Sequence, residues 1–479
     1  MISNTTVSWR YRSQSLISVA LLGVGFFQLI HLHLQVKSSG LASISALALV
    51  LVLALPKLAL REKVLVSLAF LSTLFALLLS DSPCDLLERA GLQAAFLTAF
   101  MVLLSLLRDG AVTSGSVLNL GKFLTSRSPG RRYLAIHCGG QLLGMVLNFG
   151  ALTLLGPLIQ RGARSVETAN ETLANWREQR QLSALMRGFS WTVAWSPATV
   201  SMAITVSVVD GANLLIVCSY GLTAAAGSLL IGWLLDRYTG NQAQAALTHV
   251  KRPAVEIQGN FPWASARRLA LVCLALFGFS ILAIVANQSA TVPALMLASP
   301  LVTVVWLAVQ HKKVVAGSGT IFQRLRSIAG KSVPAGVPEA ITLASAGYIG
   351  VIVVALIDPL WFAGKTGITS VAEPWLYVHV MALVPLLSNL AMPPILTVTV
   401  MGGLYSTLPF AGIDPNLLAC SLSWGWALNL TASPFGGVPL ILGRITGIPS
   451  TRLSWHWNGL FSVIMFLWCS GCIALLARG

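Results

Sequence analysis

Long runs of apolar residues, separated by short polar connections, dominate the sequence. A membrane-spanning helix needs about 20 predominantly apolar residues. Runs of this kind lie near 16–34, 41–60, 64–80, 91–107, 133–159, 212–235, 268–288, 291–309, 340–363, 376–392 and 459–477. The stretch 393–411 is either a further span or part of a broken one. The pattern predicts an all-α polytopic membrane protein with about ten to twelve transmembrane helices.

Basic residues gather in the connections between these runs, mainly in 108–132, 236–268 and 310–331. Cytoplasmic loops retain lysine and arginine, so these three connections are predicted to be cytoplasmic. The connection 161–182 mixes arginine with glutamate, and we interpret it as a helix along the membrane interface, with a solvated loop helix as the alternative. Its arginines predict that it lies on the same side of the membrane as 108–132. A single predicted span separates the two segments, however, and one span would place them on opposite sides. Either residues 111–125 also enter the membrane, or 161–182 is external.

Composition supports the membrane class and excludes others. Of the 479 residues, 56% are hydrophobic and 10% are charged, and the net charge is +16. A soluble domain carries roughly 25% charged residues, so a soluble enzyme, a nucleic-acid-binding domain and a disordered protein are all excluded. Most of the seven cysteines lie in or beside apolar runs, where we interpret them as small residues that pack in the interior. The sequence contains no recognisable catalytic, metal or cofactor motif, so we predict a protein that is not an enzyme and has no cofactor.

Two interrupted apolar stretches resemble each other. Residues 187–204 read RGFSWTVAWSPATVSMAI and residues 424–441 read WGWALNLTASPFGGVPLI, with the two Ser-Pro pairs 237 positions apart. Residues 138–147 and 345–354 form a second, weaker pair of similar segments upstream. Because the two kinds of segment occur in the same order in both halves of the chain, the sequence indicates a duplicated architecture. The predicted transmembrane repeats cover residues 1–240 and 241–479.

The Ser-Pro pairs are expected to break their helices. Proline removes a backbone donor and clashes with the preceding turn, and freed backbone groups in hydrocarbon must face protein or a water-filled cavity. A single Ser-Pro is usually only a kink. Two breaks at corresponding positions, each among further polar residues, instead indicate a transporter's binding site. The candidate substrate- or ion-binding residues are Ser196, Pro197, Thr199, Ser201, Asn429, Thr431, Ser433, Pro434, Gly436 and Gly437.

Duplicated halves with broken helices resemble the ion transporter superfamily, which includes divalent anion:sodium symporters, citrate carriers and arsenite permeases. The resemblance is architectural and spans most of the chain. The Ser-Asn-Thr signature of the symporters is absent, because Ser-Pro-Ala-Thr at 196–199 and Ser-Pro-Phe-Gly at 433–436 stand in its place. The resemblance implies two inverted repeats, each with a re-entrant hairpin or broken helix, whose hairpin tips each contribute half of one ion and substrate site.

Few ionisable residues lie within or beside the apolar runs. Arg187 and Arg444 flank the two breaks, where a guanidinium could contact an anion, although an arginine that snorkels from a span end is the alternative. Asp210 could bind a cation or a proton, or could cap the following helix. His137 is expected to be a satisfied core histidine, and Asn148 to hydrogen-bond a neighbouring helix.

These observations predict a secondary active transporter of a small, anionic solute, coupled to Na⁺ or H⁺ and working by alternating access. The alternative is a non-transporting polytopic protein, either a scaffold or a subunit of an envelope export system. The expected partners are a small solute or ion and the lipid bilayer, with a homodimer left open and nucleic acid excluded. The expected location is a bacterial inner membrane.

Overall fold

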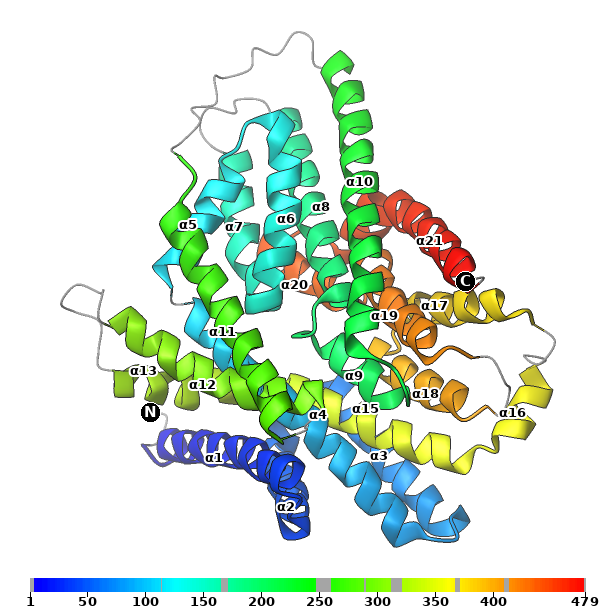
Figure 1. The fold of residues 1–479 in the computed structure, drawn as a ribbon. Helices are drawn as coiled ribbons and strands as arrows, with labels where there is room; N and C mark the ends of the chain where they lie inside the picture. Colours follow the sequence, from blue (N-terminus) through cyan, green and yellow to red (C-terminus); the bar gives the residue numbers. More distant parts are fainter. Residues whose placement is uncertain are drawn as a thin grey trace. The chain divides into compact units, whose positions relative to one another are not determined.

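The computed structural model describes residues 4–112, 114–164, 171–246, 260–287, 290–311, 321–366, 371–408 and 413–477. Every element of regular secondary structure within these ranges is a helix (Figure 1). Nine helices of this described part are long and apolar enough to cross a membrane. They coincide with nine of the eleven apolar runs, which confirms an all-α polytopic membrane protein. The two remaining runs, 133–159 and 376–392, take part in hairpins.

The chain forms two compact units, and each unit takes segments from both halves of the sequence. Unit 1 comprises Met1–Ala111 and Leu271–Phe362, and unit 2 comprises Val112–Ala270 and Ala363–Gly479. These units each combine two separate segments, whereas the predicted repeats divide the sequence near its middle, into 1–240 and 241–479. The repeats remain a prediction.

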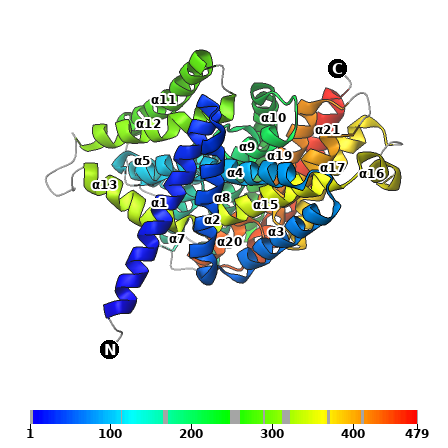
Figure 2. The same cartoon turned by 90° about the horizontal axis from the view of Figure 1, so that it is seen from below.

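Unit 1 contains most of the long apolar helices. Its elements are α1 (Asn4–Leu34), α2 (Lys37–Ala54), η1 (Leu55–Lys57), α3 (Leu60–Leu79), α4 (Pro83–Val112), most of α11 (Trp263–Asn287), α12 (Thr291–His311), α13 (Ile321–Ser327), η2 (Ile328–Ser332), α14 (Val333–Ala335), α15 (Val337–Leu356) and the start of α16 (Pro359–Thr366). α1 lies beside α2, as Figure 2 shows, and α3 packs against α15. A buried apolar cluster formed by Ala76, Leu86, Ala90 and Ile352 joins α3, α4 and α15.

Unit 2 contains the broken helices. Its elements are α5 (Gly115–Thr125), α6 (Pro129–Leu147), α7 (Gly150–Ala163), α8 (Glu171–Trp195), α9 (Val200–Val208), α10 (Leu214–Ala246), α17 (Glu373–Asn389), α18 (Pro394–Ser406), α19 (Pro415–Ala432), α20 (Gly437–Thr446), the π-helical turn η4 (Arg452–His456) and α21 (Trp457–Leu476). α8 ends directly before Ser196, and α19 ends directly before Ser433. The predicted openings at the two Ser-Pro pairs are therefore confirmed.

The predicted single span 133–159 is wrong, because the chain turns within it. α6 and α7 lie against each other and form hairpin 1, and Asn148 at the turn has φ 50° and ψ −136°. A hairpin returns the chain to the side from which it came. Residues 108–132 and 161–182 can therefore share one side of the membrane, as their arginines predict, without a further span between them.

The stretch 393–411 is likewise part of a hairpin. α17 and α18 lie against each other and form hairpin 2, and Ala391 at the turn has φ 64°. Pro393 and Pro394 follow this turn, where proline suits the start of a helix.

Unit 2 itself is built from two equivalent sets of helices. The order hairpin 1, α8, α9, α10 is repeated as hairpin 2, α19, α20, α21. The contacts are reciprocal as well, because α9 packs against α18 of hairpin 2, and α20 packs against α7 of hairpin 1. By contrast, the sequence match between 138–147 and 345–354 does not reflect equivalent positions, since the first segment lies in α6 of unit 2 and the second in α15 of unit 1.

The connection 161–182 is not a separate interfacial helix where the structure describes it. Residues 165–170 lie outside the described ranges, and residues 171–182 form the first half of α8. Several of their side chains, including Leu173 and Glu178, are buried against unit 2. Arg161 and Arg164 therefore belong to the end of α7, and Glu171, Arg177, Glu178 and Arg180 to the start of the broken helix α8.

Candidate functional site: two broken helices in unit 2

The two breaks have the same local structure. In the first, the N–H of Thr199 donates to the carbonyl of Ser196 (3.2 Å), and in the second the N–H of Gly436 donates to the carbonyl of Ser433 (3.0 Å). Thr199 and Gly436 then take extended conformations and precede α9 and α20. Each Ser-Pro segment thus forms one tight turn, in which the serine carbonyl is paired with the N–H three residues later.

The broken helices run in opposite directions. Past the first break, the N–H of Asn213 donates to Oδ1 of Asn416 near the start of α19 (2.7 Å). Past the second break, Gln160 links the carbonyl of Thr446 to Glu178 near the start of α8. Each broken helix therefore ends beside the beginning of the other.

The breaks flank the point where α8 and α19 touch. Ser423 Oγ of α19 donates to the Val193 carbonyl of α8 (3.0 Å). Val193 lies three residues before Ser196, and Ser423 lies ten residues before Ser433. Because the helices are antiparallel and rise about 1.5 Å per residue, the two breaks are about 20 Å apart along the helix axes. Each break thus forms its own polar region.

Several buried polar side chains along these helices have an atom without a hydrogen-bond partner among the described residues. In unit 2 they are Ser183, Ser190, Trp191, Ser196, Ser201, Thr397, Trp424 and Asn429. Buried polar groups in proteins are almost always paired, and an unpaired one costs about 1–3 kcal/mol. The concentration of such atoms on α8 and α19 indicates a place where water, an ion or a solute supplies the partners.

Asn429 is the most polar of these groups. Its side chain is fully buried, and neither its amide oxygen nor its amide nitrogen has a partner among the residues that the structure describes. Trp191 and Trp424 are also fully buried and offer indole N–H groups, which can only donate. Trp191 and Trp424 lie within two residues of the contact between Val193 and Ser423, whereas Asn429 lies six residues beyond Ser423, toward the second break.

The two break serines differ in their surroundings. Ser433 Oγ donates to the carbonyl of Ser388 in hairpin 2 (3.0 Å) and lies 3.3 Å from the Ser388 hydroxyl. Ser196 Oγ has no such partner among the described residues, although Ser196 is equally buried. The second break is therefore held to its hairpin by its serine, whereas the serine of the first break is left available.

The remaining predicted residues of the breaks have structural contacts of their own. The Thr199 hydroxyl donates to the Ser196 carbonyl (2.8 Å), and Thr431 accepts from Ser462 of α21 (2.9 Å). A side chain at Gly436 would meet the Asn429 carbonyl at 3.0 Å, and one at Gly437 would meet the Phe149 ring at 3.1 Å. The prolines Pro197 and Pro434 lie within the turns themselves.

Arg187 is buried among hydrogen-bond acceptors. It is 7% exposed, and its guanidinium donates to Oδ1 of Asn458 (2.7 Å), to the Trp457 carbonyl (3.2 Å) and to the Gly232 carbonyl (3.4 Å). It also lies over the Phe461 ring. These contacts give Arg187 a packing role between α8, α10 and α21, and its predicted anion contact remains a prediction.

Arg444 and Asp210 are both exposed. Arg444 lies in the last turn of α20, where a cation interacts favourably with the helix dipole. Asp210 precedes the turn at Gly211, but the cap of α10 is Asn213, whose Oδ1 accepts from the N–H of Leu215 (2.9 Å). The alternative in which Asp210 caps the next helix is therefore wrong.

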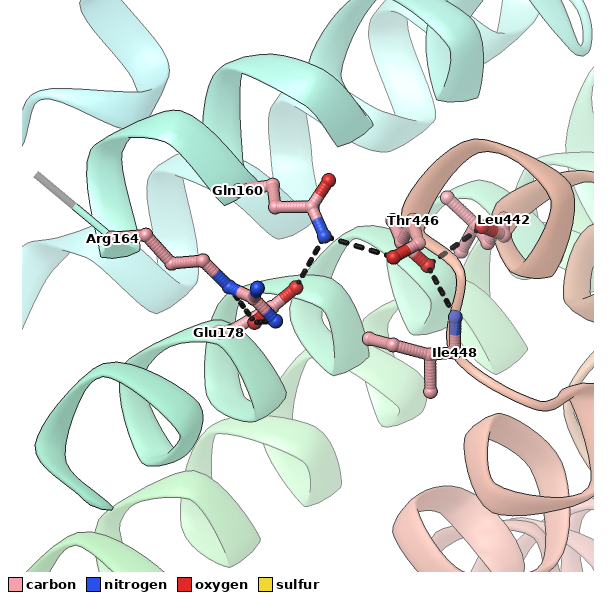
Figure 3. Close-up of polar contacts among 6 residues, drawn as sticks. All are labelled: Gln160, Arg164, Glu178, Leu442, Thr446 and Ile448. Atoms are coloured by element: carbon pink, nitrogen blue, oxygen red, sulfur yellow. Dashed lines mark hydrogen bonds and ion pairs between the residues drawn. The ribbon is translucent and has the colours of Figure 1, made fainter. Parts of the chain in front are cut away.

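A polar network ties hairpin 1 to the ends of both broken helices (Figure 3). Glu178 of α8 is 2% exposed and accepts from Gln160 Nε2 (2.9 Å) and Arg164 Nε (3.0 Å). Gln160 Nε2 also donates to the Thr446 carbonyl at the end of α20 (2.9 Å). One amide thus connects α7, α8 and α20.

The two charged members of this network are expected to differ in their effect on stability. Replacing Arg164 by methionine strands the buried carboxylate of Glu178, and an uncompensated buried charge costs several kcal/mol. Replacing Glu178 by glutamine keeps an acceptor for Gln160 and leaves Arg164, whose side chain is 55% exposed, to the solvent. Thermal unfolding in detergent should therefore show a larger loss for Arg164→Met than for Glu178→Gln, and equal losses would contradict this assignment.

Sequence reasoning missed the buried tryptophans and Thr397. Trp191 and Trp424 lie within the two matched segments, so their presence was visible, but a hydropathy pattern treats tryptophan as apolar and gives no sign of an unpaired indole N–H. Thr397 lies on α18, where only the polar position inside an apolar helix could have indicated it.

The fold defines a polytopic membrane protein built entirely of helices in the part that the structure describes. The chain is similar to the crystal structure of the YdaH transporter of Alcanivorax borkumensis, with a TM-score of 0.53 and 15% identity over 87% of this chain and 98% of that chain. It is also similar to MtrF of Neisseria gonorrhoeae, described within a class of antimetabolite efflux pumps, with a TM-score of 0.51 and 12% identity over 87% of this chain and 94% of that chain.

No family model matches the sequence, and no curated protein sequence matches it. The likeness to the two transporters is therefore one of fold. The resemblance to the ion transporter superfamily stays a prediction.

Proposed function

We propose that this protein is a secondary active transporter that moves a small anionic solute by alternating access, coupled to Na⁺ or H⁺. The observation that carries the proposal is the set of buried, unpartnered polar atoms on the two antiparallel broken helices. A purely structural core would pair these atoms or replace them with apolar groups. The fold shared with YdaH and MtrF supports the same function.

The chemistry of the site favours a solute that accepts hydrogen bonds. Trp191 and Trp424 can only donate, and the hydroxyl of Ser196 and the amide of Asn429 can donate as well. Dipolar donors of this kind bind an anion without introducing a full buried charge, whose desolvation would be costly. Carbonyls and hydroxyls at the breaks would serve a sodium ion equally well.

The proposed setting follows from the helical spans. A multi-pass helical protein of a bacterium would reside in the inner membrane, and the partners would be the solute, the coupling ion and the lipid bilayer. The homodimer remains a prediction.

Uptake into proteoliposomes tests the proposal. We expect the purified protein to accumulate at least one labelled anion from a panel of small carboxylates and inorganic oxyanions when a Na⁺ or pH gradient is imposed. Ser196→Ala should reduce uptake strongly without loss of thermal stability, because the Ser196 hydroxyl makes no hydrogen bond to the described residues. Ser433→Ala should reduce both uptake and stability, because Ser433 is bonded to Ser388.

Unchanged uptake in both serine variants would contradict the site. No accumulation of any anion by the native protein, under either gradient, would favour the non-transporting alternative.

A further inference from the structure

A line of polar side chains on α6 leads from the neighbourhood of Arg187 to the first break. Tyr133, His137 and Gln141 follow one another at intervals of four residues and so share one face of the helix. The Tyr133 hydroxyl lies 3.3 Å from His137 Nδ1, and Gln141 Nε2 lies 3.1 Å from His137 Nε2. At the far end, Trp195 Nε1 donates to Gln141 Oε1 (2.9 Å).

The donors and acceptors of this line have only one consistent arrangement. An indole N–H can only donate, so the amide oxygen of Gln141 must face Trp195. The amide nitrogen of Gln141 then faces His137 Nε2, which must be an acceptor. The proton of the imidazole is therefore on Nδ1, directed at the Tyr133 hydroxyl, and His137 is neutral. A second positive charge at this depth, close to Arg187, would also be costly.

Close backbone packing holds His137 in place. A side chain at Gly188 would meet the His137 carbonyl at 2.2 Å, so α6 and α8 approach each other as closely as glycine allows. Ser228 of α10 lies 3.3 Å from His137 Nε2 and completes the surroundings of the ring. The imidazole itself is fully buried. A rigid, neutral acceptor at this position fixes the orientation of the Gln141 amide.

We propose that His137 is a positioning residue, which acts through Gln141 to fix Trp195 at the first break. If His137 Nε2 no longer accepts, the Gln141 amide is free to turn and present N–H groups to Trp195, and two donors then face each other. Trp195 is the last residue of α8 and directly precedes Ser196, whose hydroxyl is unpartnered. The consequence for transport rests on the proposed function, whereas the positioning itself does not.

The second break supports this interpretation by comparison. There, Ser388 near the end of α17 holds Ser433 through its carbonyl and hydroxyl. Hairpin 1 holds the first break through Gln141 and Trp195 instead, so that each hairpin anchors the break of its own set of helices. The hydrogen bond that holds the first break does not involve the Ser196 hydroxyl, whereas the hydrogen bond that holds the second break is made by the Ser433 hydroxyl itself.

Nuclear magnetic resonance of the indole groups tests the proposal. The full-length protein is labelled with ¹⁵N-tryptophan in detergent, and Trp195→Phe identifies the Trp195 signal among the 14 indoles. His137→Asn retains the nitrogen position that faces Tyr133 but removes the Nε2 acceptor, whereas His137→Gln reaches Gln141 with an acceptor oxygen. We expect His137→Asn to shift the Trp195 indole proton upfield and to speed its hydrogen exchange about tenfold, the factor that ~1.4 kcal/mol represents.

His137→Gln should keep the native signal, and Gln141→Leu, which removes the direct acceptor, should reproduce the shift. Both His137 variants are polar, so equal melting temperatures would show that a difference between their spectra is local. If the two variants give the same Trp195 signal, native or shifted, the positioning role is overturned. Because the readout needs no solute, a failure to transport would count against the proposed function and not against this inference.

Discussion

Replacing Gly221 by alanine is expected to lower the melting temperature by about 5–10 °C. Gly221 lies on α10, where an added Cβ would stand 1.8 Å from the Ala194 carbonyl and 2.9 Å from Cα of Trp195. Both are atoms of the backbone, which cannot move aside as the end of a flexible side chain can. The helices must separate at the last turn of α8, and overpacking of this kind costs about 1–3 kcal/mol or more.

Gly471→Ala provides the matched control. Gly471 lies within α21, which is the counterpart of α10 in the second set of helices, and a Cβ there would meet no atom within 4 Å. Alanine is the better helix former by about 1 kcal/mol, so this variant should be unchanged or slightly stabilised. Melting curves in detergent measure both proteins, and a loss of similar size for the two glycines would show that close packing at Gly221 is not the cause.

Features that depend on local hydropathy were predictable from the sequence. Nine spans were found because length and apolar content alone define them, and the helix breaks were found because proline acts on its own turn. The turn of hairpin 1 was missed. It contains no proline or charge, and Asn148 simply adopts a positive φ inside an apolar stretch. The turn of hairpin 2 carries Pro393 and Pro394, which could have indicated it.

Features that depend on tertiary partners were not predictable. Arg187 and Asp210 looked alike in the sequence, each a charge beside an apolar run, yet Arg187 is enclosed by acceptors and Asp210 is exposed. Trp191 and Trp195 are four residues apart in one helix. The indole of Trp195 is bonded to Gln141, while that of Trp191 has no partner in the described ranges, and no pattern in the sequence separates them.

The two pairs of similar segments found in the sequence had different outcomes. The segments around Ser196 and Ser433 were matched correctly, because the same Ser-Pro turn recurs in them. The match between 138–147 and 345–354 failed, because small residues and glycine are common in any membrane helix. Reciprocal packing of α9 with α18 and of α20 with α7 identifies the true counterparts.

Replacing Asn429 by leucine is expected to raise the melting temperature by a few degrees and to reduce uptake at least tenfold. Asn429 is fully buried, and both atoms of its amide lack partners among the described residues. An apolar group of similar shape removes that desolvation cost, so a change that stabilises the fold would at the same time remove donors and an acceptor from the proposed binding site.

Asn458→Leu is the control that distinguishes this effect from a general response to leucine. Asn458 is equally buried, but its Oδ1 accepts from Arg187 Nε (2.7 Å) and its Nδ2 donates to the Leu453 carbonyl (2.7 Å). Its loss removes the shortest of the three hydrogen bonds of the buried Arg187 guanidinium, so the melting temperature should fall. Thermal unfolding and proteoliposome uptake measure both variants. If Asn429→Leu is destabilised as Asn458→Leu is, the Asn429 amide has partners that hold the fold together, and it does not belong to the binding site.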